Sequence, residues 1–316
     1  MHTSEIKKPS PLSIWAAMIS IYFVWGSTYL AIRFAVETIP PFMMAAARFL
    51  VAGGILYLWR RLRGDPRPSR LEWRSAAIIG GFLLVGGNGC VVWAEQRVFS
   101  GITSLIVASA PLWIALIDRL VLSRLASTRQ RYPPLTALGV VVGFVGIVLL
   151  VGPGQLIGLS GSASGGVDPL GGGVLLLGSL LWSIGSLYTR HARLPASPLL
   201  GTGMEMLAGG AGLLLLSTLT GEWARLDLAA IAPQSAWGLV YLIFFGALVG
   251  FGAYTWLLRV APTSLVSTYA YVNPVVAIFV GNLLAQEPLS PRVVIAAVVI
   301  LGAVALITLT QPASRK

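Results

Sequence analysis

Ten apolar segments follow one another along this chain, each about 20 residues long and separated from the next by a short polar stretch. A helix needs about 20 mostly apolar residues to cross the ~30 Å hydrocarbon core of a bilayer. Proline and glycine stand at most of the junctions, where they favour turns. The segments lie near residues 14–36, 42–59, 76–95, 101–119, 134–152, 170–189, 199–218, 235–258, 264–285 and 291–311. The pattern predicts an all-α polytopic membrane protein with ten transmembrane helices.

The composition agrees with lipid as the main solvent of this chain. Its 316 residues are 56% hydrophobic and only 10% charged, with a mean hydropathy of +0.82, whereas soluble domains carry about 25% charged residues. Cys90 is the single cysteine, so an intrachain disulfide is excluded. The two histidines, His2 and His191, lie far apart, and we expect no metal site.

The basic residues fix the orientation and argue against a nucleic-acid partner despite the net charge of +11. They lie in short loops between the apolar segments, where they orient a membrane protein. With the N-terminus inside, seventeen Lys and Arg residues face the cytoplasm: Lys7, Lys8, Arg60, Arg61, Arg63, Arg67, Arg70, Arg74, Arg119, Arg124, Arg129, Arg131, Arg190, Arg193, Arg259, Arg315 and Lys316. The outer loops hold only Arg97, Arg225 and Arg292. We therefore expect both termini in the cytoplasm and a multi-pass protein of the inner (plasma) membrane.

The sequence also resembles itself. A shift of 157 residues places the first two segments on the sixth and seventh without a gap, and a shift of 163 places the third and fourth on the eighth and ninth. The first shift pairs Trp25 with Trp182, Arg33 with Arg190, Pro41 with Pro198, Leu50 with Leu207 and Gly53 with Gly210; the second pairs Gly87 with Gly250, Trp93 with Trp256 and Pro111 with Pro274. Matches of tryptophan, proline, arginine and glycine in one register indicate a true repeat.

The repeat predicts two five-helix halves, residues 12–152 and 170–311, joined by a Gly/Ser-rich external linker over residues 153–169. Because five is an odd number, the two halves must cross the membrane in opposite directions. Inverted repeats place a substrate site near the midplane, where the halves meet, and allow alternating access.

Four motifs carry a family resemblance. They are Trp25-Gly26-Ser27-Thr28-Tyr29, Gly86-Gly87-Asn88-Gly89 with Trp93-Ala94-Glu95, Glu205-Met206-Leu207-Ala208-Gly209-Gly210, and Ser267-Thr268-Tyr269-Ala270-Tyr271-Val272-Asn273-Pro274-Val275-Val276. With these motifs the chain resembles the EamA family of the drug/metabolite transporter superfamily over about residues 12–310. The resemblance implies ten helices in inverted repeats and transport of small metabolites. The acidic residue that the family carries after helix nine is present as Glu287, but its counterpart after helix four is missing.

The first candidates for a central cavity are aromatic. Trp25 and Trp182 fall halfway along their segments, although tryptophan in membrane helices usually lies at the interface. Two interpretations stay open: the indoles pack the core, or they line a cavity and bind a solute by stacking or cation–π contact. Thr28, one turn after Trp25, is a further candidate.

The second candidates are charged residues within segments. Arg48, near the outer end of helix two, and Glu205, near the inner end of helix seven, occupy equivalent repeat positions. Such charges usually face a cavity or a partner; the alternative is snorkelling to the interface. We expect Arg48 to hold a substrate carboxylate and Glu205 an amine or proton, without direct pairing of the two. Arg33 and Glu95, at outer helix ends, are further candidates.

The third candidates lie where helices are interrupted. Asn88 lies in a glycine-rich stretch, and Asn273 precedes Pro274, whose repeat counterpart is Pro111. Kinked helices at matching positions of two halves indicate a transport site; the alternative is a simple kink with an asparagine bonding a neighbouring helix. Tyr269 and Tyr271 point to different faces, so at most one of them lines the same cavity as Asn273.

These features predict a secondary transporter that exports small organic metabolites such as amino acids. The segments hold no Ser-His-Asp set and no phosphate-binding loop, so we expect neither an enzyme nor a cofactor. The expected partners are a small-molecule solute and the lipid bilayer. The alternative is a non-transporting sensor or assembly protein with the same fold. Few buried carboxylates are expected, which favours facilitated movement or exchange over proton coupling. The sequence leaves the solute and the oligomeric state open.

Overall fold

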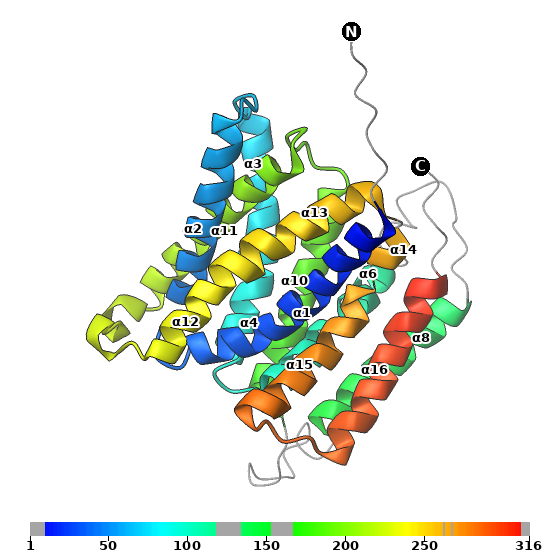
Figure 1. The fold of residues 1–316 in the computed structure, drawn as a ribbon. Helices are drawn as coiled ribbons and strands as arrows, with labels where there is room; N and C mark the ends of the chain where they lie inside the picture. The colour runs from blue at the N-terminus through cyan, green and yellow to red at the C-terminus, as the bar shows by residue number, and fades with distance from the viewer. Residues whose placement is uncertain (1–9, 118–133, 153–166, 262, 267, 311–316) are drawn as a thin grey trace.

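The computed structural model describes residues 10–117, 134–152, 167–261, 263–266 and 268–310, and within these ranges all regular secondary structure is helical (Figure 1). The first half contains α1 (Pro11–Ala35), α2 (Pro41–Leu62), α3 (Arg70–Gly80), η1 (Gly81–Asn88), α4 (Gly89–Ala94), α5 (Ser100–Val107), α6 (Ala110–Ile117) and α8 (Pro134–Val151). The second half contains α10 (Pro169–Thr189), α11 (Pro198–Leu219), η3 (Glu222–Arg225), η4 (Leu228–Ala230), α12 (Pro233–Tyr241), η5 (Leu242–Val249), α13 (Gly250–Val260), α14 (Thr263–Val266), α15 (Tyr269–Ala285) and α16 (Pro291–Thr310).

Each predicted apolar segment coincides with helical structure in the described part of the chain. Eight helices there are long and apolar enough to span a membrane, and two shorter apolar helices cover Leu135–Val151 and Tyr269–Ala285. The predicted linker falls almost wholly within residues 153–166, outside the described residues. Figure 1 places the beginning of α1, the end of α16 and the α2–α3 turn toward the upper side of the molecule.

The predicted start of the third segment, at residue 76, was wrong. The helix begins at Arg70, because Ser69 and Glu72 form a capping box that satisfies free N–H groups of the first turn. This polar first turn extends the helix beyond its apolar part.

The two halves pack mainly against each other (Figure 1). α1 packs on α12, α13 and α15, and its repeat equivalent α10 packs on η1, α4, α5 and α6. The pairs α2–α11 and α8–α16 each join one helix to its own equivalent in the other half. The interhalf contacts therefore follow the registers of the sequence repeat.

α2 and α11 are in close contact, because two glycines let their backbones approach. A Cβ atom at Gly53 would lie 2.9 Å from the backbone nitrogen of Leu207, and one at Gly210 would lie 3.0 Å from that of Leu50. Small residues at such crossings are typical of packing in membranes. The two contacts are equivalent, because the 157-residue shift exchanges Gly53 with Gly210 and Leu50 with Leu207.

Candidate functional site

Trp25 lies at the centre of an aromatic cluster that joins α1 to the eighth and ninth spans. Its ring centroid lies 5.3 Å from that of Phe251 and 5.2 Å from those of Tyr254 and Tyr269. Its Nε1 donates to the carbonyl oxygen of Gly246 at 3.1 Å. The indole is therefore positioned by helices of both halves, and it packs part of the interface between them.

This hydrogen bond predicts a measurable stability effect. Trp25→Phe keeps an aromatic ring but removes the Nε1 donor to Gly246, and we expect it to lower the free energy of unfolding by about 1 kcal/mol. Thermal denaturation of the purified protein measures the change. Trp15→Phe is the matched control, because Trp15 lies on the same helix and is 50% exposed. Equal effects of the two substitutions would contradict a positioned Trp25.

The two central tryptophans pack in the same way on equivalent glycines. A Cβ atom at Gly250 would overlap the Trp25 indole, and one at Gly87 would lie 2.9 Å from Cε3 of Trp182. Each glycine belongs to, or directly follows, a π-helical stretch, η1 or η5. π-helical turns are rare in proteins as a whole, and those that occur are often found at functional sites. The sequence repeat did not predict these widened turns.

Arg48 lies beside the Trp25 cluster and is buried within the protein. Gly246 is the common neighbour, because a Cβ atom there would lie 2.9 Å from Cγ2 of Thr28 and 3.1 Å from Nη2 of Arg48. The Arg48 residue is 5% exposed, and its Nε and Nη1 have no hydrogen-bond partner. The structure thus favours the buried interpretation of Arg48 over snorkelling.

Glu95 supplies an opposite charge close to Arg48. It is 3% exposed, and neither of its carboxylate oxygens has a hydrogen-bond partner. It interacts electrostatically with Arg48, Arg33 and Glu287, but forms an ion pair with neither arginine. Two buried and incompletely bonded groups of opposite charge therefore lie near each other where α1, α2 and the end of α4 meet. The sequence ranked Glu95 below Arg48 because it ends its helix.

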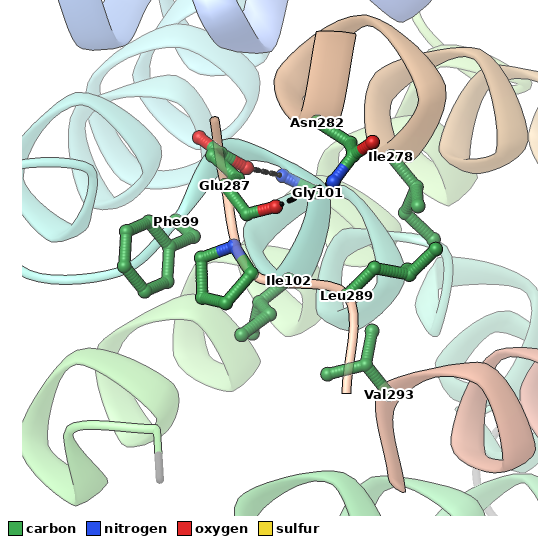
Figure 2. Close-up of a pocket in the computed structure, with 9 residues that line it drawn as sticks. Phe99, Gly101, Ile102, Ile278, Asn282, Glu287, Leu289 and Val293 are labelled. Atoms are coloured by element: carbon green, nitrogen blue, oxygen red, sulfur yellow. Dashed lines mark hydrogen bonds between the residues drawn. The ribbon is translucent and has the colours of Figure 1, made fainter. Parts of the chain in front are cut away.

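Glu287 forms a clamp on the predicted outer side, at the first turn of α5 (Figure 2). Its carboxylate accepts hydrogen bonds from Nη1 of Arg33 at 3.0 Å and from the backbone nitrogen of Ser100 at 2.9 Å. It also accepts one from the backbone nitrogen of Gly101 at 3.0 Å, which Figure 2 draws. The free N–H groups and the dipole of a helix N-terminus favour an anion there. This set of contacts, the outer clamp, joins the ends of α1 and α15 to α5.

The ninth span holds the predicted Tyr269, Tyr271, Asn273 and Pro274. Tyr269 joins the Trp25 cluster, whereas Tyr271 packs against the main core, so the two rings face different sides as predicted. Asn273 is 8% exposed, and its amide nitrogen can donate to the carbonyl oxygens of Tyr22 and Tyr269 at 3.3 Å. Pro274 lies inside α15 and does not interrupt it; α15 begins after a turn at Thr268. The helix is therefore not broken at this proline, and the kink there stays a prediction.

Pro111 lies where the prediction placed it, directly after an interruption of the fourth span. The chain turns at Ala108 and Ser109 between α5 and α6. Two serines of α10 approach the carbonyl groups there: Ser183 donates to the oxygen of Ala110 at 3.0 Å and Ser179 to that of Ile106 at 3.4 Å. Serine side chains of a neighbouring helix thus hydrogen-bond to backbone carbonyls on both sides of the interruption.

The remaining candidates lie apart from the Arg48 group. Asn88 belongs to η1, next to the Gly87–Trp182 contact, and its buried Oδ1 has no partner. Glu205 is half-buried on α11 and forms no ion pair with Arg48. The candidates therefore separate into one group around Gly246, which contains Trp25, Thr28, Arg48 and nearby Tyr269 and Asn273, and a second around Gly87, which contains Trp182 and Asn88.

A cavity of about 380 Å³ opens on the predicted cytoplasmic side, and we call it the inner cavity. It is lined by Arg60, Ala196, Ser197, Leu199, Gly252, Thr255 and Trp256, from the end of α2, the start of α11 and α13. Sites for small molecules are commonly ~300–1,000 Å³. No cluster of three metal-ligating side chains occurs among the described residues.

Comparison with known proteins finds similarity to the EamA-like transporter family over almost the whole chain. The model of the EamA-like transporter family matches residues 12–152 and 170–309. The uncharacterized inner membrane transporter YedA of Escherichia coli strain K12 is 39% identical over 300 residues, which cover 94% of this chain and 91% of YedA. A WAT1-related chloroplastic protein of Arabidopsis thaliana is 26% identical over 94% of this chain and 70% of its own length.

A solved protein structure shares the fold, with a TM-score of 0.59 at 21% identity, covering 95% of this chain and 98% of the other. The helical interhalf packing, the apolar spans and the family match over both halves all point to the same class of protein. This chain belongs to the EamA-like transporter family and is a multi-pass transporter of the inner membrane.

Proposed function

We propose that the protein is a secondary carrier that exports small zwitterionic metabolites, amino acids among them, by alternating access between two inverted halves. The observation that carries this proposal is the pair of buried charges, Arg48 and Glu95: Nε and Nη1 of Arg48 and both carboxylate oxygens of Glu95 have no hydrogen-bond partner. Burying a charged group without hydrogen bonds costs several kcal/mol. A solute that supplies both partners therefore gains from two groups at once.

A zwitterion fits the chemistry of this pair. A carboxylate accepts hydrogen bonds from the guanidinium of Arg48, and an ammonium donates to the carboxylate of Glu95. The aromatic cluster of Trp25 and Tyr269 adjoins Arg48 through Gly246 and offers apolar surface to a side chain. Arg48 approaches Gly246 of the second half, so the buried pair borders the contact between the two halves, where inverted-repeat carriers bind their solutes.

The asymmetry between the two sides bears on which state of the transport cycle the structure represents. On the predicted outer side the outer clamp joins three spans, while on the cytoplasmic side the inner cavity is present. This arrangement corresponds to an inward-facing state that loads its solute from the cytoplasm. Export then requires the outer clamp to open after the inner cavity closes.

Counterflow in proteoliposomes tests the proposal. We expect uptake of at least one labelled amino acid from a panel, and no competition by its amide or N-acetyl analogue, each of which lacks one of the two charges. Arg48→Gln and Glu95→Gln should each lower the apparent affinity by a factor of about 30, which equals roughly 2 kcal/mol. Glu37→Gln is the matched control, because Glu37 is an exposed carboxylate on the same predicted side.

Two results would count against the proposal. Absence of counterflow for every solute, with a folded protein, would support the alternative of a sensor or assembly protein. If the amide and the N-acetyl analogue each inhibit uptake as strongly as the unlabelled parent amino acid does, the protein is still a carrier. Its solute then does not need both charges, and the zwitterion is excluded.

A further inference from the structure

Two acidic residues occupy equivalent positions after α2 and α11, yet they hold different partners. The 157-residue shift pairs Asp65 with Glu222. Each follows a glycine with a left-handed backbone, Gly64 with φ 91° and Gly221 with φ 69°, and these glycines are also a repeat pair. The same local turn therefore presents a carboxylate on opposite predicted sides of the membrane.

Glu222 caps the start of α2 on the outer side. It is fully buried, and its carboxylate accepts from the backbone nitrogens of Phe42 at 3.2 Å and Met43 at 2.8 Å. These N–H groups have no partner within the helix, and the N-terminal dipole favours the negative charge. The contact ties the end of α11 to the start of α2, so it joins the two halves on the side that the outer clamp also joins.

Asp65 does not make the equivalent contact on the inner side. The repeat equivalents of Phe42 and Met43 are Leu199 and Leu200, in the first turn of α11. Asp65 instead accepts two hydrogen bonds from Arg60, from Nε at 2.8 Å and from Nη2 at 2.7 Å. The residue before α11, Ser197, gives the helix no side-chain cap. The inner cavity opens at this place, lined by Arg60, Ser197 and Leu199.

Arg60 accounts for the difference between the two sides. Its repeat equivalent is Ser217, which carries no charge and leaves Glu222 free to cap α2. Hydrogen bonds from Arg60 lower the pKa of Asp65, and the neighbouring Ser197 hydroxyl acts in the same direction. Asp65 is therefore a charged acceptor beside an uncapped helix N-terminus.

We propose that Asp65 and Glu222 are alternating latches: Asp65 leaves Arg60 and caps α11 when the inner cavity closes, while Glu222 releases α2 as the outer side opens. The inference rests on the alternating-access mechanism proposed above and adds the residues that hold each closed state. In the present structure the outer latch is engaged and the inner latch is held back. Each latch binds backbone N–H groups of a helix N-terminus, which keep their arrangement within the helix. Forming or releasing the cap therefore requires only that the carboxylate and its turn change position relative to that helix.

Cysteine accessibility tests the latches without measuring transport. Thr255→Cys in a Cys90→Ala background places a single thiol in the inner cavity, and a membrane-impermeant maleimide added to inside-out vesicles reports its exposure. Asp65→Asn removes the inner latch and should raise the labelling rate about fivefold. Arg60→Ser copies the other half, frees Asp65 to cap α11, and should lower the rate by a similar factor. Glu222→Gln weakens the outer latch and should also lower it.

The opposite signs of Asp65→Asn and Arg60→Ser separate a latch from an ordinary ion pair. If Asp65 and Arg60 only stabilise their turn, both substitutions break the same contact and shift labelling in the same direction, which would overturn the proposal. Unchanged labelling in both would overturn it as well. Asp65→Glu, which lengthens the side chain to that of Glu222, supplies a folded second variant and should lower labelling as Arg60→Ser does.

Parallel counterflow with the unsubstituted protein separates the two proposals. If that protein transports a solute and the labelling still fails the sign test, the latches are wrong and the carrier function stands. If the labelling rates change in the predicted directions but no solute shows counterflow, the latches stand. In that case either the solute panel lacks the transported solute or the proposed carrier function is wrong.

Discussion

Gly53→Leu is expected to prevent stable folding, with a loss of at least about 3 kcal/mol in the free energy of unfolding. A side chain at this position would meet backbone atoms of the facing helix, because its Cβ would lie 2.9 Å from the carbonyl oxygen of Gly203 and 2.9 Å from the nitrogen of Leu207. Backbone cannot move aside as a side-chain end can, so α2 and α11 would have to separate.

Gly54→Leu is the control for this prediction. Gly54 is the next residue on the same helix, and a Cβ atom there would have open space within 4 Å. The intrinsic helix propensities of the two variants are equal, so their difference isolates the packing. Fluorescence-detected size exclusion and thermal denaturation measure the outcome. Equal behaviour of the two variants would contradict the close α2–α11 contact.

Glu287→Ala is expected to destabilise the outer side by about 3–5 kcal/mol, the cost of removing one partner from a buried ion pair. The Glu287 carboxylate is 6% exposed, and its loss leaves Arg33 and two backbone N–H groups of α5 without their acceptor. The unfolding free energy in detergent measures the total cost.

Two further variants identify the contacts that produce this effect. Glu287→Gln keeps one carbonyl oxygen as an acceptor and should lose about half as much. Arg33→Gln removes only the guanidinium and leaves the cap on α5 in place, so its effect should also be smaller than that of Glu287→Ala. A loss below ~1 kcal/mol for Glu287→Ala would show that the outer clamp contributes little.

The sequence alone predicted the arrangement of the helices well, because the repeat constrains contacts as well as lengths. The repeat alignments pair Trp25 with Trp182 and Gly87 with Gly250. In the structure Trp25 packs on Gly250 and Trp182 packs on Gly87, so the two contacts are equivalent. The distinct sides of Tyr269 and Tyr271 followed from helical geometry. In each case the relevant information lay within one segment or in one register.

The contacts that form the outer side were not predicted, because they join loops to distant helix starts. Glu287 binds Ser100, and Glu222 binds Met43, across 187 and 179 residues. In a sequence these carboxylates resemble ordinary loop charges, and their burial depends on where two helix N-termini come to lie. Among the described residues Glu95, Glu222 and Glu287 are buried, out of eleven acidic residues in the chain.

One signal for these sites was present and unused. The 157-residue register that aligns the tryptophans also aligns Asp65 with Glu222 and Gly64 with Gly221, and a repeat-matched glycine–carboxylate pair after two helices is typical of a shared turn. The π-helical stretches η1 and η5 left no comparable signal, because their widened turns depend on the packing around Gly87 and Gly246.

The central claim is that the two halves cross the membrane in opposite directions, and labelling of one pair of equivalent residues tests it most directly. Arg63 and Thr220 are exposed, are the C-cap residues that follow α2 and α11, and are related by the 157-residue shift. Arg63→Cys and Thr220→Cys are made separately in the Cys90→Ala background and treated with an impermeant maleimide in intact cells and in inside-out vesicles. The inverted repeat predicts that Thr220→Cys is labelled only in intact cells and Arg63→Cys only in inside-out vesicles. Labelling of both from the same side would contradict the inverted architecture.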